Sequence, residues 1–221
     1  MNISNQQANQ MKQEISINFD SLTLFGNLTI PEKTTGLVLF AHGSGSSRFS
    51  PRNNFVAQVL NNANIATLLI DLLTEQEEKI DIITRELRFD IPMLAGRVVA
   101  TTQWVKNQKN LKDFSLGYFG SSTGAAAALI AAAKVPDIKA VVSRGGRPDL
   151  ALEYLPEVKA ATLLIVGGLD HQVITMNETA LKALQCEKKL EIVPGATHLF
   201  EEPGKLEEVA QLAAEWFEKY L

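Results

Sequence analysis

The stretch that decides the fold runs from Leu116 to Lys134 and reads LGYFGSSTGAAAALIAAAK. An apolar strand leads into the turn GSSTG at 120–124, and an alanine-rich helix follows it. Strand, sharp turn and helix in this order are the context that a G-x-S-x-G motif requires, because the turn lifts the central serine hydroxyl above the sheet edge. The two glycines and the alanines after them indicate that strand and helix pass very close to each other. We therefore expect Ser122 in a strained turn at the top of a sheet.

The composition around this stretch is that of an ordinary globular domain. The chain has 221 residues, of which 46% are hydrophobic and 21% charged, enough for one α/β core. The net charge is -4 and the basic residues are scattered, so the sequence predicts neither nucleic acid nor an anionic membrane as a partner. The single cysteine, Cys186, excludes an internal disulfide and a cysteine-cluster metal site. No apolar run approaches the roughly 20 residues that span a bilayer, and the polar N-terminus lacks a secretory h-region, so we expect a cytoplasmic protein.

Continuous apolar runs on both sides of the elbow predict strands that are buried on both faces. The strands predicted to be buried lie at 36–41, 65–70, 114–119, 138–143, 161–166 and 188–193. Helical patterns lie between or after them, at 53–62, 91–106, 173–184 and 205–220, besides the alanine-rich helix. Strands that alternate with helices imply right-handed crossovers and a mainly parallel sheet.

The remaining segments set the limits of the predicted domain. Residues 1–13 are rich in Asn and Gln and are expected to form a flexible leader. Alternating apolar residues over 14–30, with a turn at Asp20, predict an antiparallel hairpin at a sheet edge. The charged segment 72–89 shows no clear pattern, and we expect a solvated turn at 75–79. The connection at 144–160 is too short for a lid domain, so a single domain at 14–221 is predicted.

Candidate catalytic residues follow three of the predicted strands. Sites in open parallel sheets form at the carboxyl ends of the strands. A serine becomes a nucleophile only beside a base, and the base needs an acid that holds it in one tautomer. Ser122, Asp170 and His198 each lie just past an apolar strand, in the chain order Ser, Asp, His. The sequence predicts that these three side chains converge into a catalytic triad.

The other histidines and one other aspartate are weaker candidates. His42 lies in a glycine-rich loop, which favours a role in shaping an oxyanion hole. His171 directly follows Asp170 and should point away from the group that Asp170 orients. Asp71 also ends an apolar strand and competes as the acid, although it precedes the serine in the chain. A purely structural alternative for Asp170 is the N-cap of the helix predicted at 173–184.

A tetrahedral intermediate needs two preorganised hydrogen-bond donors for its oxyanion. The residue after the nucleophile supplies the first, the backbone N–H of Thr123. The loop after the first buried strand should supply the second, and Ser44 N–H is preferred there, with Gly43 or Gly45 as alternatives. This loop lacks the lysine of a P-loop and the third glycine of a dinucleotide-binding loop, which disfavours nucleotide binding. No metal and no cofactor are expected.

Arginines in two loops of the same predicted rim leave two interpretations open; they are Arg48, Arg52, Arg144 and Arg147. Guanidinium groups bind carboxylates through two parallel hydrogen bonds. An anionic substrate is therefore one interpretation, with His42, Arg48 and Arg144 as possible substrate-binding residues. The favoured interpretation is that the arginines face water or pair with nearby acidic side chains, namely Asp149, Glu201 and Glu202.

From Glu14 to Leu221 the chain resembles the α/β-hydrolase superfamily and, within it, the dienelactone-hydrolase-like proteins. The matching stretches are FAHGSG at 40–45, GSSTG at 120–124, GLD at 168–170 and GATH at 195–198. The resemblance implies an α/β-hydrolase fold, a three-layer sandwich with a mostly parallel sheet, an antiparallel N-terminal hairpin and no lid domain. It maps Ser122 to the nucleophile, Asp170 to the acid and His198 to the base.

One position departs from the pattern of the family. Dienelactone hydrolases carry cysteine as the nucleophile, where this chain has Ser122. The expected function is therefore a serine hydrolase that cleaves a small soluble carboxylic ester, lactone or thioester through an acyl-enzyme. Two alternatives remain: a binding or regulatory protein that keeps the fold without turnover, and an acyltransferase whose acceptor is not water. The expected partner is a small-molecule substrate, and the expected assembly is a monomer or a homodimer.

Overall fold

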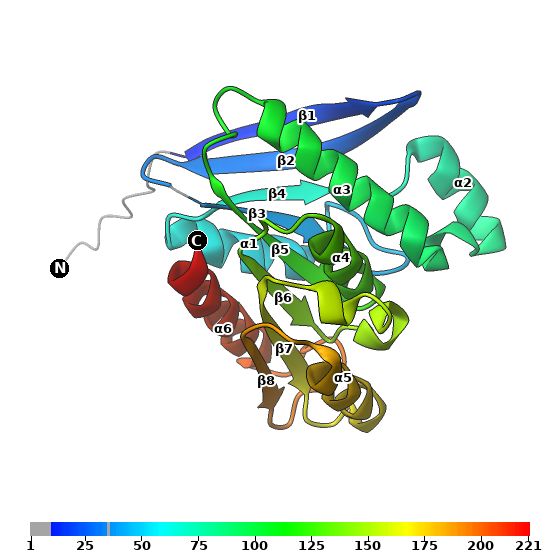
Figure 1. Ribbon diagram of the computed structural model, residues 1–221, viewed down its shortest axis with the longest axis vertical. Helices are drawn as coiled ribbons and strands as arrows, with labels where there is room; N and C mark the ends of the chain where they lie inside the picture. Colours follow the sequence, from blue (N-terminus) through cyan, green and yellow to red (C-terminus); the bar gives the residue numbers. More distant parts are fainter. Residues whose placement is uncertain (1–9, 35) are drawn as a thin grey trace.

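The computed structural model describes residues 10–34 and 36–221 (Figure 1). Within them, eight strands alternate with six α-helices and three short 3-10 helices. The strands are β1 (Gln10–Phe19), β2 (Leu22–Pro31), β3 (Gly36–Ala41), β4 (Ala66–Ile70), β5 (Ser115–Ser121), β6 (Ala140–Arg144), β7 (Ala161–Gly167) and β8 (Lys188–Val193). The α-helices are α1 (Pro51–Asn62), α2 (Glu75–Thr84), α3 (Ile91–Asn107), α4 (Thr123–Lys134), α5 (His171–Ala183) and α6 (Lys205–Tyr220). None of the helices in these residues has the length and apolarity needed to cross a membrane.

All eight strands form one sheet in the order β1-β2-β4-β3-β5-β6-β7-β8. Strands β3 to β8 run parallel to one another, and the β1–β2 hairpin joins antiparallel at one edge through β2 and β4. Helices α3, α4 and α5 cover one face, and α1 and α6 cover the other (Figure 1). The predicted three-layer architecture is confirmed.

The two faces of the sheet bury separate apolar clusters. Val98 of α3 and Leu129 of α4 lie in the cluster on one face, and Val56 of α1 and Phe217 of α6 lie in the cluster on the other. Because a strand places alternate side chains on opposite faces, a strand between two helix layers must be apolar at every position. This is why the apolar runs located the central strands closely. Every residue of β3, for example, is buried. The prediction that 188–193 is buried on both faces is wrong, because β8 is an edge strand and only its last residue, Val193, is buried.

The N-terminal hairpin starts earlier than predicted. β1 begins at Gln10, and its first residues pair with β2, as Gln13 does with Leu28. Residues 10–13 of the expected leader are therefore part of the sheet, while residues 1–9 lie outside the described residues. An edge strand has an exposed side and therefore accepts polar residues. These polar residues break the apolar alternation by which a strand is predicted. The turn after it lies where expected, with Asp20 at a φ of 49°.

The segment expected as a solvated turn at 75–79 is instead the first half of α2. Thr74 caps this helix, because its hydroxyl accepts the N–H of Glu77 at 3.2 Å while the Glu77 carboxylate accepts the N–H of Thr74 at 2.7 Å. This reciprocal pair is a capping box. The only buried residue of α2 is Asp81, and the helix leaves its isoleucines exposed. The apolar stripe that marks most helices is therefore missing, which explains the wrong prediction.

Close packing at the elbow explains both glycines of the G-x-S-x-G motif. A Cβ atom added to Gly120 would lie 2.3 Å from Ala125 Cα, the backbone of α4. A Cβ atom added to Gly124 would lie 2.3 Å from the carbonyl oxygens of both Ala41 and His42, at the end of β3. Backbone atoms cannot move aside as the end of a flexible side chain can. The predicted close approach of strand and helix is confirmed.

We expect the Gly124→Ala variant to be strongly destabilised, by about 3 kcal/mol, because the added methyl group overlaps two backbone oxygens. The free energy of unfolding in urea measures the loss. Gly96→Ala is the matched control, because a Cβ at Gly96, inside α3, has nothing within 4 Å. That variant should gain up to about 1 kcal/mol, since alanine has the higher helix propensity. Equal stabilities of the two variants would contradict the packing argument.

Candidate active site

Ser122 sits in the strained turn that the sequence predicts, between β5 and α4. Its backbone has a φ of 51° and a ψ of -121°, a conformation that costs a non-glycine residue about 1–3 kcal/mol. The end of β6 and the loop after it hold this conformation from both sides. The Ser122 N–H donates to the carbonyl of Arg144 at 3.1 Å, and the Ser122 carbonyl accepts the N–H of Arg147 at 3.1 Å. The neighbouring hydroxyl, Ser121 Oγ, points away from the turn and donates to Asn53 Oδ1 of α1 at 2.9 Å.

Asp170 and His198, which are 28 residues apart in the chain, meet at the same edge of the sheet. Asp170 follows β7 and His198 lies in the loop after β8; Asp170 Oδ2 and His198 Nδ1 are 2.6 Å apart. The Asp170 side chain is 17% exposed and that of His198 is 38% exposed. Asp170 occupies the N-cap position of α5, as the structural alternative expects, but its side chain makes no capping bond to the helix. The pair leaves the Nε2 atom of His198 for another partner.

The imidazole of His198 stands over the loop that clamps Ser122. A Cβ atom added to Gly145 would lie 3.5 Å from both Nδ1 and Cε1 of His198, and Gly145 directly follows the residue whose carbonyl holds the Ser122 N–H. Within the described residues no hydrogen bond joins Ser122 Oγ to His198. Hydrogen bonds between catalytic groups are often long before substrate binds and tighten in the complex. The structure thus places the predicted serine, acid and base at one edge.

The rival acid Asp71 is engaged elsewhere. Its two carboxylate oxygens accept the backbone N–H of Arg48, at 2.8 Å, and the Arg48 guanidinium. Arg48 also pairs with Glu14 of β1 at 2.8 Å and lies over the rings of Phe25 and Phe49. The charge of Arg48 is thus neutralised within the fold, which disfavours Arg48 as a substrate-binding residue.

Both ring nitrogens of His42 bond to the backbone, which disfavours His42 as a substrate-binding residue. Its Nε2 accepts the N–H of Leu72 at 3.0 Å, so Nδ1 carries the proton and donates to the carbonyl of Gly43 at 2.9 Å. Both ring nitrogens thus bond to the backbone and tie the loop after β3 to the end of β4. Burial lowers the pKa of His42, which keeps this ring neutral. The role of His42 in shaping an oxyanion hole stays a prediction, and these contacts fix the loop in which that hole is expected.

The preferred second oxyanion donor, Ser44 N–H, already has an acceptor. It donates to Oγ1 of Thr123 at 2.9 Å, so it does not point at a substrate oxygen. Gly43 lies closer to the nucleophile, since a Cβ atom there would be 3.1 Å from Ser122 Cβ. Among the described residues, neither the N–H of Gly43 nor that of Thr123, the first residue of α4, has an acceptor. These two groups are better placed donors than Ser44.

The other rim arginines divide into two kinds. Arg52 pairs with Glu201 at 2.9 Å and Arg147 pairs with Asp149 at 2.8 Å, two of the ion pairs that the sequence favoured. Arg144 has no acidic partner among residues 10–34 and 36–221, although its residue is only 7% exposed. The sequence analysis did not predict that the loop after β6 would bond to the backbone of Ser122. The signal was available in Gly145, which adopts a φ of 52° to turn the chain back toward Ser122.

A hollow of about 420 Å³ opens beside the loop after β3, toward α2. Its lining includes Phe25, Phe49 and Leu73 with the polar side chains of His42 and Asp71. Ser122, Asp170 and His198 do not line it. In the part of the chain that the structure describes, no group of three or more His, Cys, Asp or Glu side chains could hold a metal ion.

Comparisons with known proteins agree with this architecture. A dienelactone hydrolase from Anabaena variabilis is 59% identical, with a TM-score of 0.95, over 96% of this chain and 99% of that one. Est1E from Butyrivibrio proteoclasticus shares the fold at 18% identity, with a TM-score of 0.77, over 93% of this chain and 98% of that one.

Two curated relatives, from two strains of Mycobacterium tuberculosis, are 51% identical over 210 residues and provisionally named phosphoribosyl transferases. The match covers 95% of this chain but 46% of each relative, so the chain spans about half their length. The family model of the dienelactone hydrolases matches residues 55–221. By this match, and by its likeness to the Anabaena enzyme, the chain belongs to the dienelactone hydrolase family.

Proposed function

We propose that this chain is a serine hydrolase that cleaves a small carboxylic ester, lactone or thioester through an acyl-enzyme on Ser122. One observation carries the proposal: the Asp170–His198 pair at 2.6 Å stands over the loop that clamps a serine in the strained conformation of a nucleophile elbow. An imidazole held on one nitrogen by a carboxylate is in the tautomer that accepts a proton at the other. Membership of a hydrolase family supports the same reaction class.

The reaction follows from these positions. His198 Nε2 takes the proton of Ser122 Oγ as that oxygen attacks the substrate carbonyl, and Asp170 stabilises the resulting imidazolium. The tetrahedral intermediate collapses when the C–O or C–S bond to the leaving group breaks, and His198 returns its proton to that group. A water molecule then attacks the acyl-enzyme with His198 as base, which releases the acid and restores the serine.

The oxyanion of the intermediate lies, in this proposal, between the N–H groups of Thr123 and Gly43. Gly43 replaces Ser44 because the Ser44 N–H is bonded to the Thr123 side chain. The hydrogen bond between Ser44 N–H and Thr123 Oγ1 instead ties the loop after β3 to the first residue of α4. Removing one oxyanion donor typically costs about 3 kcal/mol of transition-state stabilisation, so the placement of this loop is central to the rate.

Phosphoribosyl transfer, which the names of the curated relatives contain, is not proposed for this chain. The match spans less than half of each relative. The groups at the site here are a serine, an imidazole and a carboxylate, which are those of acyl transfer. The loop FAHGSG also lacks the lysine with which phosphate-binding loops contact phosphates. We further infer a small-molecule substrate and a cytoplasmic location, as the composition indicates, and a monomer or homodimer.

A fluorophosphonate probe and an ester panel test the proposal. The probe should label the wild-type chain, and p-nitrophenyl esters should turn over fastest with short acyl chains, because no lid domain covers the site within the described residues. A lactone panel then narrows the substrate class, and added alcohols show whether acyl groups pass to an acceptor other than water.

A chain that resists the probe, while a ligand raises its melting temperature, would instead be a binding protein with this fold.

A further inference from the structure

Arg144, the last residue of β6, carries a buried charge without a counter-ion. Its residue is 7% exposed, and no side-chain hydrogen bond or ion pair of the guanidinium occurs within the described residues. Nη1 is fully buried without an acceptor. The other three rim arginines each pair with a carboxylate, as described above. Arg144 is therefore the exception at this edge of the sheet.

Such an arrangement is unfavourable unless something else compensates the charge. An unpaired buried charge loses the hydration that it has in water, and proteins normally pair it. Burial, with a smaller contribution from the nearby charge of Arg52, lowers the pKa of Arg144 to about 10. Arg144 therefore stays protonated near neutral pH. The fold therefore holds a positively charged guanidinium that favours the binding of an anion.

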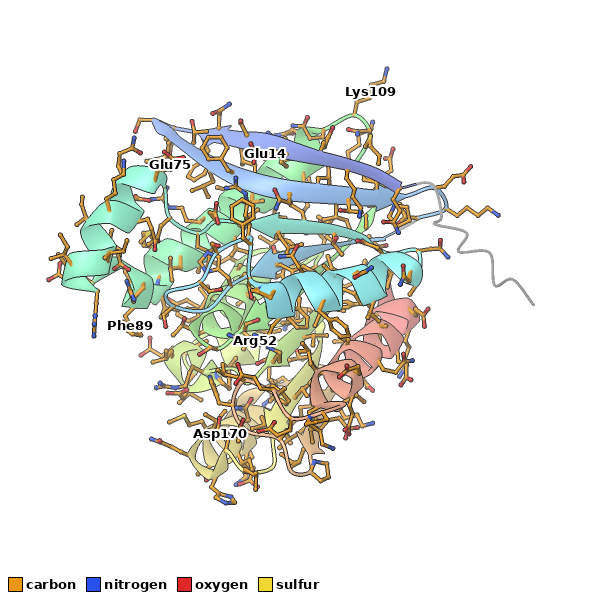
Figure 2. The ribbon with its side chains drawn as sticks, turned by 180° about the vertical axis from the view of Figure 1, so that it is seen from behind. Glu14, Arg52, Glu75, Phe89, Lys109 and Asp170 are labelled. Carbon is orange, nitrogen blue, oxygen red and sulfur yellow. The ribbon has the colours of Figure 1, made fainter. Side chains whose placement is uncertain are left out.

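The surroundings place this guanidinium close to the candidate active site. Ala140 and Val142 of the same strand lie in the apolar cluster under α1 and α6, so by alternation Arg144 projects to that face. Ser121, which pairs with Arg144 across the sheet, contacts Asn53 of α1. Arg52, labelled at the start of α1 in Figure 2, reaches Glu201 in the segment that follows His198. Arg144 thus lies near the start of α1 and the loop of the proposed base.

We propose that Arg144, with Arg52 beside it, forms a binding site for one singly charged small anion, a halide or a carboxylate. A single charge fits because Glu201 already neutralises Arg52 and only the charge of Arg144 is left. Arg52 contributes a second donor, since its Nε is also buried without an acceptor. A bound anion would tie the start of α1 to the strand end whose carbonyl holds Ser122. The anion comes either from solution or from a carboxylate on the substrate.

Thermal unfolding of the full chain tests the site without any enzymatic activity. Melting temperatures are compared in sodium chloride, sodium formate and sodium HEPES at equal ionic strength, because the HEPES anion is too bulky for so buried a group. Wild type should melt about 4 °C higher in at least one of the small-anion salts, as expected for a ligand well above its Kd. Arg144→Met should lose this difference. In HEPES it should melt no lower than wild type, because it lacks the unpaired charge.

Arg147→Met is the matched control, because Arg147 lies in the same loop but pairs with Asp149. It should keep the salt-dependent difference. A variant Arg144→Met that keeps the difference, or an Arg147→Met variant that loses it, would place the anion elsewhere and overturn the proposal.

A second comparison identifies a substrate carboxylate as the source, and this arm alone rests on the proposed hydrolase function. The substrates are p-nitrophenyl butyrate and the p-nitrophenyl monoester of succinic acid, which differ mainly by a terminal carboxylate. If the substrate supplies the anion, kcat/KM should favour the succinate ester about tenfold in wild type and not in Arg144→Met. Two results together would contradict the proposal. The melting temperatures would be equal in all three salts, and a chain that hydrolyses the butyrate ester would show no preference for the succinate ester.

Discussion

The Ser122→Ala variant should lose about 10⁶-fold in kcat on the best ester substrate, as removal of the serine does in enzymes that use this triad. The loss is so large because no other hydroxyl can take over. Ser121 Oγ is bonded to Asn53 and points away from the turn, and Thr123 Oγ1 accepts the N–H of Ser44. Initial rates at high enzyme concentration, and labelling by the fluorophosphonate probe, measure the effect.

The fold should survive this change. Ser122 Oγ makes no hydrogen bond within the described residues, and alanine keeps the Cβ atom that the turn already accommodates. The melting temperature should therefore stay within about 2 °C of the wild-type value, the scale of a typical surface substitution. Ser121→Ala is the control, because it removes the adjacent hydroxyl and should keep kcat within about tenfold. Equal labelling of wild type and Ser122→Ala would mean that another residue is the nucleophile.

Burial is one of the factors that determine how well an element can be predicted from the sequence. β3 was predicted with its observed bounds because all of its residues are buried between two helix layers. β1 was predicted four residues too short, since most of its side chains face solvent at the sheet edge. α2 was missed because it buries only Asp81, although the capping residues Thr74 and Glu77 could have revealed its start. Local chemistry remains informative where the apolar pattern fails.

For the candidate site, the order of residues along the chain was informative, but the hydrogen bonds between distant residues were not predictable. The chain order of Ser122, Asp170 and His198, each after a strand, was enough to bring them to one edge. The acceptor of Ser44 N–H could not be predicted, because it is a side chain 79 residues away. The partners of Arg48 were also missed, because Glu14 comes from an edge strand that only the sheet order brings near. Hydrogen bonds between distant loops depend on details that residue types do not encode.

The Asp170→Asn variant should lose about 10⁴-fold in kcat with little change in KM, because the amide supports the wrong tautomer of His198. An asparagine NH₂ group donates to Nδ1, which moves the imidazole proton to Nε2. The nitrogen that should accept the serine proton is then already protonated. The size of the side chain is unchanged, so packing around the 17% exposed carboxylate should be preserved. Steady-state kinetics and the rate of fluorophosphonate labelling report the loss.

Asp71→Asn should lower stability and leave kcat nearly unchanged, which tests the assignment of Asp170 as the acid. Asp71 binds the backbone and the guanidinium of Arg48, so its loss should lower the free energy of unfolding by about 2 kcal/mol, the cost of breaking a partly buried charged hydrogen bond. Its kcat should stay within about tenfold of the wild-type value, because no proton of the proposed reaction passes through it. If instead Asp71→Asn lost kcat and Asp170→Asn kept it, the acid would be Asp71. The 2.6 Å contact between Asp170 and His198 would then serve only to fix the loop after β8.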